Sequence, residues 1–315
     1  MVSKEVTGRP RVAIILGPTG VGKSQLALDL AEELGGEIVS ADSMQVYRLM
    51  DIGTDKPCLE DRKRVRHHML DLVLPDQPFH AGLFRALARR AIEQISARRK
   101  VPLVVGGTGL YIKSLTHGLF QTPAIDPAVR GRLKGEGEAE GGEFLYRRLL
   151  KVDPKTAGHL HPNDLFRIVR ALEVFESTGV PISFFRDRHG FGESPYSLLK
   201  IGLAMDREKL YRRIEERVDR MMARGFLDEV ERLLAMGYGS QLKPMQSLGY
   251  KQLVGVLLKN VEQGEAIRQI KRDTRRYAKR QWTWFRTDPE VLWSDESLDR
   301  KRVLRAVSSF FKGGE

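Results

Sequence analysis

The segment with the most specific chemistry is GPTGVGKS at residues 17–24. Its glycines, Gly17 and Gly22, precede Lys23 and Ser24 in the Gly-x-x-x-x-Gly-Lys-Ser pattern of a phosphate-binding loop. Glycines let backbone N–H groups converge on phosphate oxygens, and a helix that begins after the loop adds the positive end of its dipole. Lys23 would supply a positive charge, and the Ser24 hydroxyl would contact Mg²⁺. The pattern therefore predicts a site for a phosphorylated ligand with magnesium.

A second chemical candidate is Asp42, which follows the apolar run EIVS of residues 37–40. A carboxylate there could bind magnesium or a ribose, act as a general base, or only cap the turn that follows it. The run VPLVV, by contrast, ends in Gly106 and Gly107, although a P-loop NTPase usually has an aspartate after such a strand. This absence weakens the interpretation of the ligand as ATP without excluding it.

Other polar residues lie in weaker motifs. The adjacent His67 and His68 have the wrong spacing for two metal ligands on one helix face, so we expect them to position a loop. Thr108, in the turn GGTGLY, could contact a sugar-phosphate, although an ordinary strand-to-helix turn explains it equally well. The polar turn at 51–57 is expected to be architectural or exposed. Cys58 is the only cysteine, which excludes an internal disulfide and a zinc site built from cysteines.

The elements that must position these residues alternate between strands and helices. Buried strands are predicted at 11–17, 37–41 and 101–107, and helices at 23–34 and 81–100. This alternation favours an α/β protein with a parallel sheet flanked by helices, whose ligands gather at the carboxyl ends of the strands. The phosphate-binding loop and Asp42 both follow such strand ends, so we expect them to lie close together.

After the third predicted strand, the alternation of strands and helices is interrupted by a long segment without a convincing buried strand. LLKIGLAM at 198–205 predicts a returning strand, followed by helices from about 206 to 234 and from 266 to 285. Residues 121–197 show amphipathic stretches without a convincing buried strand, and GEGEAEGG at 135–142 has the composition of a mobile surface loop. We therefore expect a catalytic core formed by residues 10–120 and 198–315, with a helical insertion domain at 121–197.

Charge and hydropathy limit the possible partners. The net charge of +12 and the isoelectric point near 9.8 favour a polyanionic ligand, although solubility alone also explains a basic chain. No run approaches the roughly 20 apolar residues of a membrane helix, and the first ten residues lack the apolar core of a signal peptide. We expect a cytoplasmic protein without membrane contact.

A basic segment near the C-terminus, RQIKRDTRRYAKRQWTWFR at 268–286, is a candidate nucleic-acid surface. Its cations recur at helical spacing, so that one face matches a phosphate backbone; a solvated helix face is the simpler alternative. Its tryptophans, Trp282 and Trp284, could stack on bases, but aromatic residues on the opposite face of a long helix more often belong to the core. We expect the tryptophans to be buried.

Taken together, the motifs resemble the tRNA dimethylallyltransferases (tRNA isopentenyltransferases) of bacteria. The phosphate loop, DSMQVYRLMDIGT, HHMLD, VGGTGLY, DLFRIVRALEV, RVDRMMARGFLDEV, LGYK and YAKRQWTWFR all appear in the family's order. The resemblance covers nearly the whole chain, and DSMQVY with MDIGT is far more specific than the phosphate loop. It implies a P-loop NTPase-like parallel sheet with a helical insertion domain that contacts tRNA.

The resemblance also implies an activity. Members of the family transfer a dimethylallyl group from dimethylallyl diphosphate to the exocyclic amine of the adenosine 3′-adjacent to the anticodon, releasing pyrophosphate. The implied partners are the anticodon stem-loop of tRNA, dimethylallyl diphosphate and Mg²⁺, with a monomeric protein and no membrane. Because no γ-phosphate has to be attacked, this activity explains why Gly106 and Gly107 stand where an NTPase has an acid.

Roles are implied residue by residue where this sequence matches the family's motifs. Asp42 resembles the general base, with Thr19 and Arg217 as further catalytic residues and Ser24 as the metal contact, although many members have threonine at that position. The diphosphate-binding residues are Gly17, Pro18, Thr19, Gly20, Val21, Gly22, Lys23 and Ser24. The tRNA-binding residues are Asp42, Ser43, Met44, Gln45, Thr108, Arg130, Phe166, Arg167, Ile168, Val169, Arg170, Met245, Gln246, Ser247, Leu248, Gly249, Tyr250 and Lys251.

Two other classes of function stay open at the level of sequence. A P-loop kinase of a nucleoside or small metabolite would consume ATP. A non-catalytic RNA-binding or regulatory protein would bind RNA tightly after loss of Asp42 and would form no product.

Overall fold

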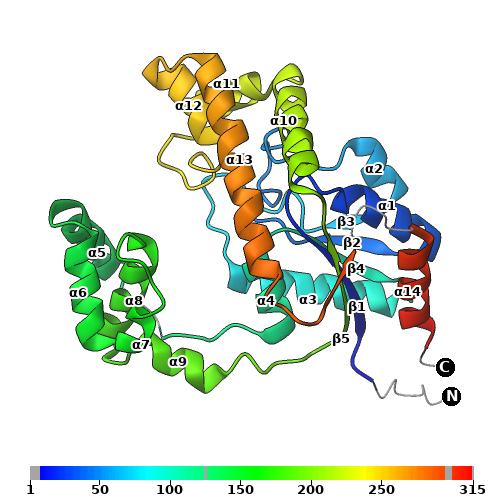
Figure 1. Cartoon of the computed structure of the whole chain (residues 1–315), viewed down its shortest axis with the longest axis horizontal. Coiled ribbons are helices and arrows are strands. Elements are labelled where there is room, and N and C mark those ends of the chain that lie inside the picture. The colour runs from blue at the N-terminus through cyan, green and yellow to red at the C-terminus, as the bar shows by residue number, and fades with distance from the viewer. Residues whose placement is uncertain (1–7, 124–125, 295–299, 314–315) are drawn as a thin grey trace. The chain divides into compact units, whose positions relative to one another are not determined.

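A computed structural model describes residues 8–123, 126–294 and 300–313 (Figure 1). The first seven residues, which bear on the expected lack of a signal peptide, and residues 314–315 at the end of the predicted core lie outside the described residues. The chain divides into two compact units, Met1–Thr116 with Pro195–Glu315 and His117–Ser194. We refer to the first as the sheet unit and to the second as the helical unit.

The described part of the sheet unit contains one parallel six-stranded sheet with the strand order β3-β2-β4-β1-β5-β6. Its strands are β1 (Arg11–Leu16), β2 (Glu37–Ser40), β3 (His67–His68), β4 (Pro102–Gly106), β5 (Ser197–Leu203) and β6 (Val291–Ser294). The predicted parallel α/β sheet is confirmed. The sequence did not predict the edge strands β3 and β6, and His67 and His68, which we expected to position a loop, form β3.

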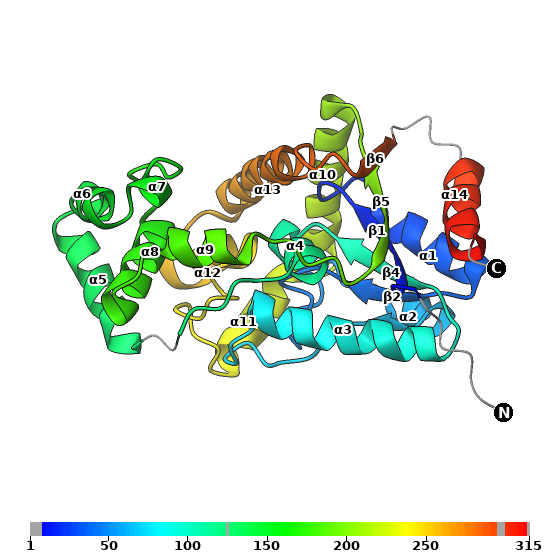
Figure 2. The ribbon, with the colours of Figure 1, turned by 90° about the horizontal axis from the view of Figure 1, so that it is seen from below.

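Helices cover both faces of this sheet (Figure 2). The described helices of the sheet unit are α1 (Lys23–Leu34), α2 (Leu59–Arg64), α3 (Ala81–Ala97), α4 (Gly109–His117), α10 (Arg207–Ala223), α11 (Phe226–Ala235), α12 (Tyr250–Lys259), α13 (Gln263–Phe285) and α14 (Arg300–Lys312). Alternate residues of β1, Ala13 and Ile15, join a buried cluster with α1 and with Val303 and Val307 of α14. Helix α3 packs against β2 and β4 on the opposite face. Within the described residues, no helix has both the length and the hydrophobicity that a membrane crossing requires.

The predicted helical region from 206 to 234 is divided in two. Helix α10 ends at Ala223, and Gly225 adopts φ +89°, in the left-handed region that favours glycine. Helix α11 begins directly after it, at Phe226, whose side chain is 1% exposed. The break thus turns the chain so that α11 can bury its own apolar face.

The helical unit consists of α5 (Pro127–Ala139), α6 (Gly142–Val152), α7 (Pro154–Ala157), α8 (Leu165–Thr178) and α9 (Ile182–His189). Leucines of α5 and α6 pack with Ile168 and Leu172 of α8 in one buried cluster. The expectation that residues 135–142 form a surface loop is wrong for residues 135–139, which complete α5. Gly137 allows close packing there, since a Cβ at this position would lie 2.7 Å from Leu165 Cδ1.

One buried carboxylate organises the loop between β2 and α2. Glu229 of α11 is 3% exposed and accepts hydrogen bonds from the backbone N–H groups of Asp51 (2.9 Å), Ile52 (2.7 Å) and Gly53 (3.1 Å). It also accepts one from the Tyr250 hydroxyl at 2.6 Å. The turn expected to be architectural is therefore fixed to α11 by three backbone donors to Glu229, and Tyr250 of α12 donates to the same carboxylate.

We predict that Glu229→Gln lowers the free energy of unfolding by about 1–3 kcal/mol, because glutamine has one acceptor oxygen and its amide nitrogen faces buried donors. Glu231→Gln, on the exposed side of the same helix, should change it by less than about 0.5 kcal/mol. Urea denaturation of both variants measures the difference, and equal stabilities would contradict the assigned role of Glu229.

Candidate active site

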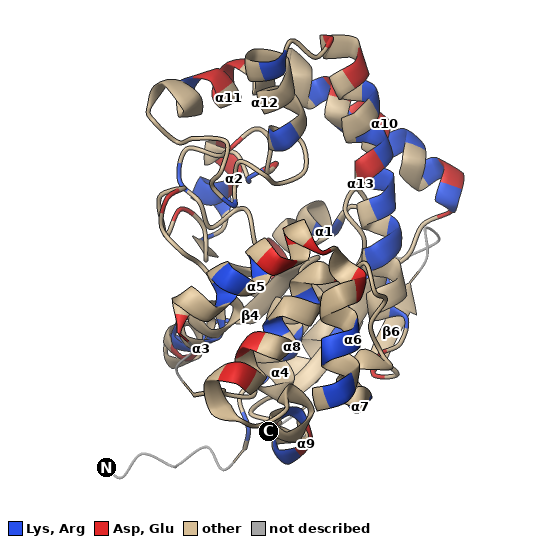
Figure 3. Ribbon diagram, turned by 90° about the vertical axis from the view of Figure 1, so that its left-hand side faces the viewer, with Lys and Arg blue, Asp and Glu red and all other residues tan. Residues whose placement is uncertain are grey.

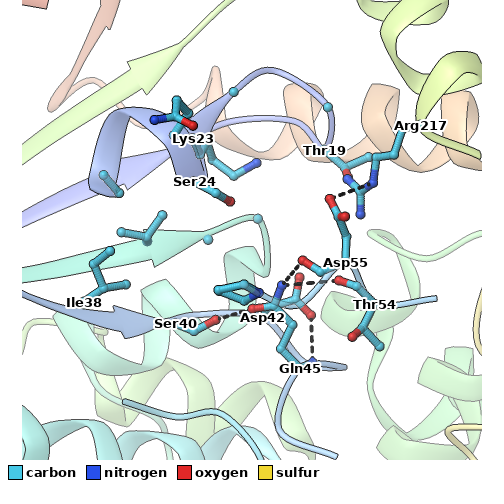
Figure 4. A pocket seen from close by; sticks show the side chains of 18 of the residues that line it. Thr19, Lys23, Ser24, Ile38, Ser40, Asp42, Gln45, Thr54, Asp55 and Arg217 are labelled. Atoms are coloured by element: carbon cyan, nitrogen blue, oxygen red, sulfur yellow. Dashed lines mark hydrogen bonds and ion pairs between the residues drawn. The ribbon is translucent and has the colours of Figure 1, made fainter. Parts of the chain in front are cut away.

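The carboxyl ends of three adjacent strands meet at one cavity of about 230 Å³ in the sheet unit (Figure 4). The phosphate-binding loop follows β1, Asp42 follows β2, and Gly107 follows β4. The cavity is lined by loop residues Thr19, Gly20, Gly22, Lys23 and Ser24, by Asp42, Gln45 and Asp55, and by Arg217 and Tyr277 from helices α10 and α13. The sequence placed the loop beside Asp42 for the reason observed, because parallel strands end at the same edge.

The loop has the backbone geometry that its glycines require. Gly17, Gly20 and Gly22 adopt backbone φ angles of +143°, +84° and +105°, which residues with a Cβ rarely adopt. A Cβ on Gly17 would lie 2.6 Å from the carbonyl oxygen of Leu203, so the loop also packs too closely on β5 for any other residue. Helix α1 begins at Lys23 and directs its N-terminus at the cavity.

Lys23 is positioned to bind an anion. Its Nζ donates a hydrogen bond to the carbonyl oxygen of Pro18 at 2.8 Å. Desolvation and the positive charge of Arg217 lower the pKa of Lys23 to about 7, although the carboxylate of Asp42 acts in the opposite direction. A bound polyanion would remove part of this penalty and restore the charge on the amine.

Thr19 and Arg217, far apart in the sequence, are in direct contact. Arg217 donates from Nη1 to Thr19 Oγ1 at 2.6 Å, and its Nε lies 3.1 Å from Asp55 Oδ2 (Figure 4). The structure thus places in contact two of the residues to which the resemblance gives a catalytic role, with Asp55 paired to the same arginine. Sequence reasoning missed Asp55 because it stands in a polar turn, although its φ of +52° marks a constrained backbone beside the cavity.

Asp42 combines the turn cap and the open carboxylate that the sequence left as alternatives. Its Oδ1 accepts hydrogen bonds from the backbone N–H groups of Met44 (2.8 Å) and Gln45 (3.3 Å). Among the described residues, its second oxygen has no hydrogen-bond donor assigned to it. The Gln45 side chain accepts from Ser40 Oγ at 2.9 Å and donates to the carbonyl of Thr54 at 3.2 Å, which fixes the turn (Figure 4).

A second cavity, of about 640 Å³, meets the first at Asp42. It is lined by Thr19, Asp42, Ser43, Met44, Arg217, residues 247–251 and, from α13, Arg272, Arg276, Tyr277 and Arg280. Burial, with the nearby charge of Asp42, raises the pKa of Tyr277 to about 12, so this hydroxyl stays protonated. Thr108 Oγ1 accepts from the Ser43 N–H at 3.1 Å and so supports the same turn.

The other residues implied in tRNA binding are placed unevenly. Met245 and Tyr250 are buried, each 1% exposed, whereas Gln246 and Lys251 are exposed and Ser247, Leu248 and Gly249 line the second cavity. In the helical unit, Phe166 is 74% exposed, but Ile168 and Val169 belong to the buried cluster. Arg167 lies near Asp164 (3.5 Å), on the helix end that also carries Phe166.

Two further arginines of the helical unit share one buried partner. Glu173 is 0% exposed and accepts two hydrogen bonds from Arg130, at 2.5 and 2.6 Å, and another from Arg170 at 2.5 Å. Burial opposes ionisation, yet the two guanidinium groups hold the pKa of Glu173 below its ordinary value. Arg130 and Arg170 therefore form a fixed positive pair.

Helix α13 carries the basic segment, and Figure 3 shows Lys and Arg along both α13 and α10. The predicted face of cations is partly neutralised by ion pairs to α10, in which Arg275 pairs with Glu215 and Lys271 with Asp219. The expected burial of the tryptophans is wrong: Trp282 and Trp284 are 37% and 44% exposed. The buried positions near this end of the helix are 278, 281 and 285, which leaves 282 and 284 at the edge of the packed face.

The fold and the cavity together define the class: an α/β protein with a P-loop-type phosphate site at the carboxyl ends of parallel strands. The sequence profile of the IPP transferase family matches residues 45–288. The chain belongs to this family and is a transferase.

Proteins similar over nearly the full chain carry the same assignment. The tRNA dimethylallyltransferase of Desulfosudis oleivorans is 51% identical over 307 residues, which is 98% of each chain. A crystal structure of the tRNA isopentenylpyrophosphate transferase of Bacillus halodurans is 38% identical with a TM-score of 0.73, covering 97% of this chain and 98% of that one. A eukaryotic dimethylallyltransferase described as acting on tRNA is 30% identical with a TM-score of 0.81, covering 96% and 80%. The resemblance and the P-loop NTPase-like fold predicted from the sequence are confirmed.

We predict that pyrophosphate binding takes up a proton at Lys23. The pKa near 7 leaves the amine largely neutral at pH 8, and a bound anion raises that pKa, so uptake should approach one proton per site. Lys23→Arg is the matched control, because guanidinium is already charged. Calorimetry at pH 8 in buffers of different ionisation enthalpy measures the uptake. Equal values for the two proteins would contradict a lowered pKa of Lys23.

Proposed function

We propose that the protein transfers a dimethylallyl group from dimethylallyl diphosphate to the exocyclic amine of the adenosine 3′-adjacent to the anticodon in tRNA. The observation that carries the proposal is the position of Asp42 where the two cavities meet, with one carboxylate oxygen fixed by backbone N–H groups and the other open. A base on one side and a phosphate site on the other suit an alkyl transfer between two bound substrates.

The first cavity is the proposed diphosphate site. Residues of the phosphate loop, the N-terminus of α1, Lys23 and Arg217 line it. Negative charge grows on the diphosphate as the allylic carbon–oxygen bond breaks, and donors already in place stabilise that charge without reorganising. The strand end at Gly106 and Gly107 has no acid to direct water at a γ-phosphate, which favours a diphosphate leaving group over ATP hydrolysis.

The residues of this cavity also fit a divalent cation, which we propose to be Mg²⁺. The Ser24 hydroxyl lines the cavity at the start of α1, and within the described part of the chain no group of three or more His, Cys, Asp or Glu side chains forms a protein cage. Such a donor set suits Mg²⁺, which usually keeps waters and binds through substrate phosphates with few protein ligands. When bound, the cation would neutralise charge on the diphosphate.

Asp42 is the proposed general base. An adenine amine is a weak nucleophile because its lone pair is delocalised into the ring, and a positioned carboxylate that accepts its proton contributes about 10²–10⁴-fold to the rate. The hydrogen bonds from Met44 and Gln45 fix the carboxylate and leave its other oxygen for that proton. Tyr277, protonated at neutral pH, lines the same junction and can donate to the base or to the diphosphate.

The second cavity is the proposed entry for the target nucleotide. Its wall carries Arg272, Arg276 and Arg280, which suit a phosphate backbone. The base must leave the stack of its loop to reach Asp42, as other base-modifying enzymes require. We infer further that the Arg130 and Arg170 pair and exposed Phe166 of the helical unit contact tRNA, that the protein acts as a monomer, and that it works in the cytoplasm, where tRNA is its substrate.

The direct test combines the protein with Mg²⁺, dimethylallyl diphosphate and a tRNA with adenosine 3′ of its anticodon. Mass spectrometry of the digested tRNA should show a dimethylallylated adenosine, with pyrophosphate released in equal amount. Phosphate transfer from ATP without a modified base would instead identify a kinase, and tight tRNA binding with neither product would identify a non-catalytic RNA-binding protein.

We predict that Asp42→Asn lowers turnover by at least about 10²-fold, because the amide cannot take up the proton, while tRNA affinity changes little. The substitution keeps an acceptor oxygen for the turn, which separates base catalysis from positioning. Single-turnover rates and tRNA titrations measure the two effects. Near-normal turnover with a large loss of affinity would make Asp42 a binding residue.

A further inference from the structure

We propose that Gln281 is a positioning residue that couples tRNA binding on α13 to diphosphate binding in the phosphate loop. The inference rests on the proposed function, since it assigns the two ligands to the two cavities. It concerns a side chain of the basic segment, directly before Trp282, for which the sequence indicated no role. Its contacts join three segments that are distant in the sequence.

The Gln281 amide spans the gap between α13 and two strand ends. Its Oε1 accepts a hydrogen bond from the backbone N–H of Thr19 at 2.8 Å, and its Nε2 donates to the carbonyl oxygen of Gly107 at 2.9 Å. The side chain is 6% exposed. One end of the amide therefore holds the phosphate loop, and the other holds the turn after β4.

The space around this amide is shaped for it. A Cβ on Gly107 would lie 2.1 Å from Gln281 Nε2, so only glycine lets the side chain reach its acceptor. The Tyr277 hydroxyl, one helical turn earlier, also interacts with Gln281 and with Thr108. Burial with both amide ends satisfied makes the position specific for glutamine, because a hydrophobic replacement would leave the Thr19 N–H and the Gly107 carbonyl without these partners.

The same helix also faces the proposed tRNA site. Arg272, Arg276 and Arg280 line the second cavity from α13, while Gln281 contacts the loop beside the first. Thr19, the residue that Gln281 holds through its N–H, also accepts the Arg217 hydrogen bond through its hydroxyl. A ligand that fixes α13 therefore fixes Thr19 and, with it, the cation that faces the diphosphate.

A link of this kind must act in both directions. If tRNA on α13 raises the affinity for a diphosphate by some factor, the diphosphate raises the affinity for tRNA by the same factor. We expect that factor to be about 5 or more in the unmodified protein, at the lower end of ordinary coupling between sites.

The experiment measures the dissociation constant of inorganic pyrophosphate with Mg²⁺, with and without saturating tRNA. In Gln281→Met, which keeps the length of the side chain but neither hydrogen bond, the ratio of the two constants should fall to near 1. In Gln269→Met, on the same helix and away from the loop, it should stay at the wild-type value. With tRNA saturating, Gln281→Met should raise KM for dimethylallyl diphosphate more than it lowers kcat.

Gly107→Ala tests the link from the other side, because its Cβ displaces the Gln281 amide while leaving that residue intact; it should also abolish the coupling. Thermal unfolding of each variant shows whether it is folded. A wild-type ratio near 1, or an unchanged ratio in both folded variants, would overturn the coupling role even if prenyl transfer is observed. A wild-type protein that binds no tRNA or transfers no prenyl group would instead overturn the proposed function.

Discussion

The site depends on how Thr19 is held. Its N–H donates to Gln281 of α13, and its hydroxyl accepts from Arg217 of α10, which also lies against Asp55. The phosphate loop is thus fixed by two helices whose contact residues lie 198 and 262 positions further along the chain. Because preorganised donors stabilise developing charge at no cost of reorganisation at the moment of reaction, this hold determines how well the loop can accept a leaving diphosphate.

The electrostatics of the site follow from the same arrangement. Burial, together with the positive charge of Arg217, lowers the pKa of Lys23 in the first cavity to about 7, while the fixed carboxylate of Asp42 lies where this cavity meets the second. A bound anion would raise the lowered pKa of Lys23, and an amine that gives up a proton suits the carboxylate of Asp42. The two substrates of the proposed reaction match these two environments. The diphosphate ester suits the positively charged first cavity, and the adenine amine suits the carboxylate of Asp42.

Local sequence patterns predicted the parts of the fold that have a periodic signal. The strands β1, β2, β4 and β5, helix α13 and the phosphate loop follow from apolar runs and glycine spacing. The edge strands β3 and β6 are short and only partly apolar, so no period marks them. Residues 135–139 have the composition of a loop, but they form the end of α5, where Gly137 packs closely against Leu165. The same limit applies to the site: strand ends place Asp42 beside the loop, whereas Asp55, Glu229 and Gln281 act through contacts between distant segments that no local pattern records.

The most direct measurement is a structure of the protein with tRNA and a non-reactive analogue of dimethylallyl diphosphate. The account predicts that the adenine exocyclic nitrogen lies within hydrogen-bonding distance of the open Asp42 oxygen. It also predicts that the diphosphate contacts the loop, Lys23 and Arg217, with the reacting carbon between nitrogen and leaving oxygen. An analogue bound elsewhere, or an adenine turned away from Asp42, would contradict it.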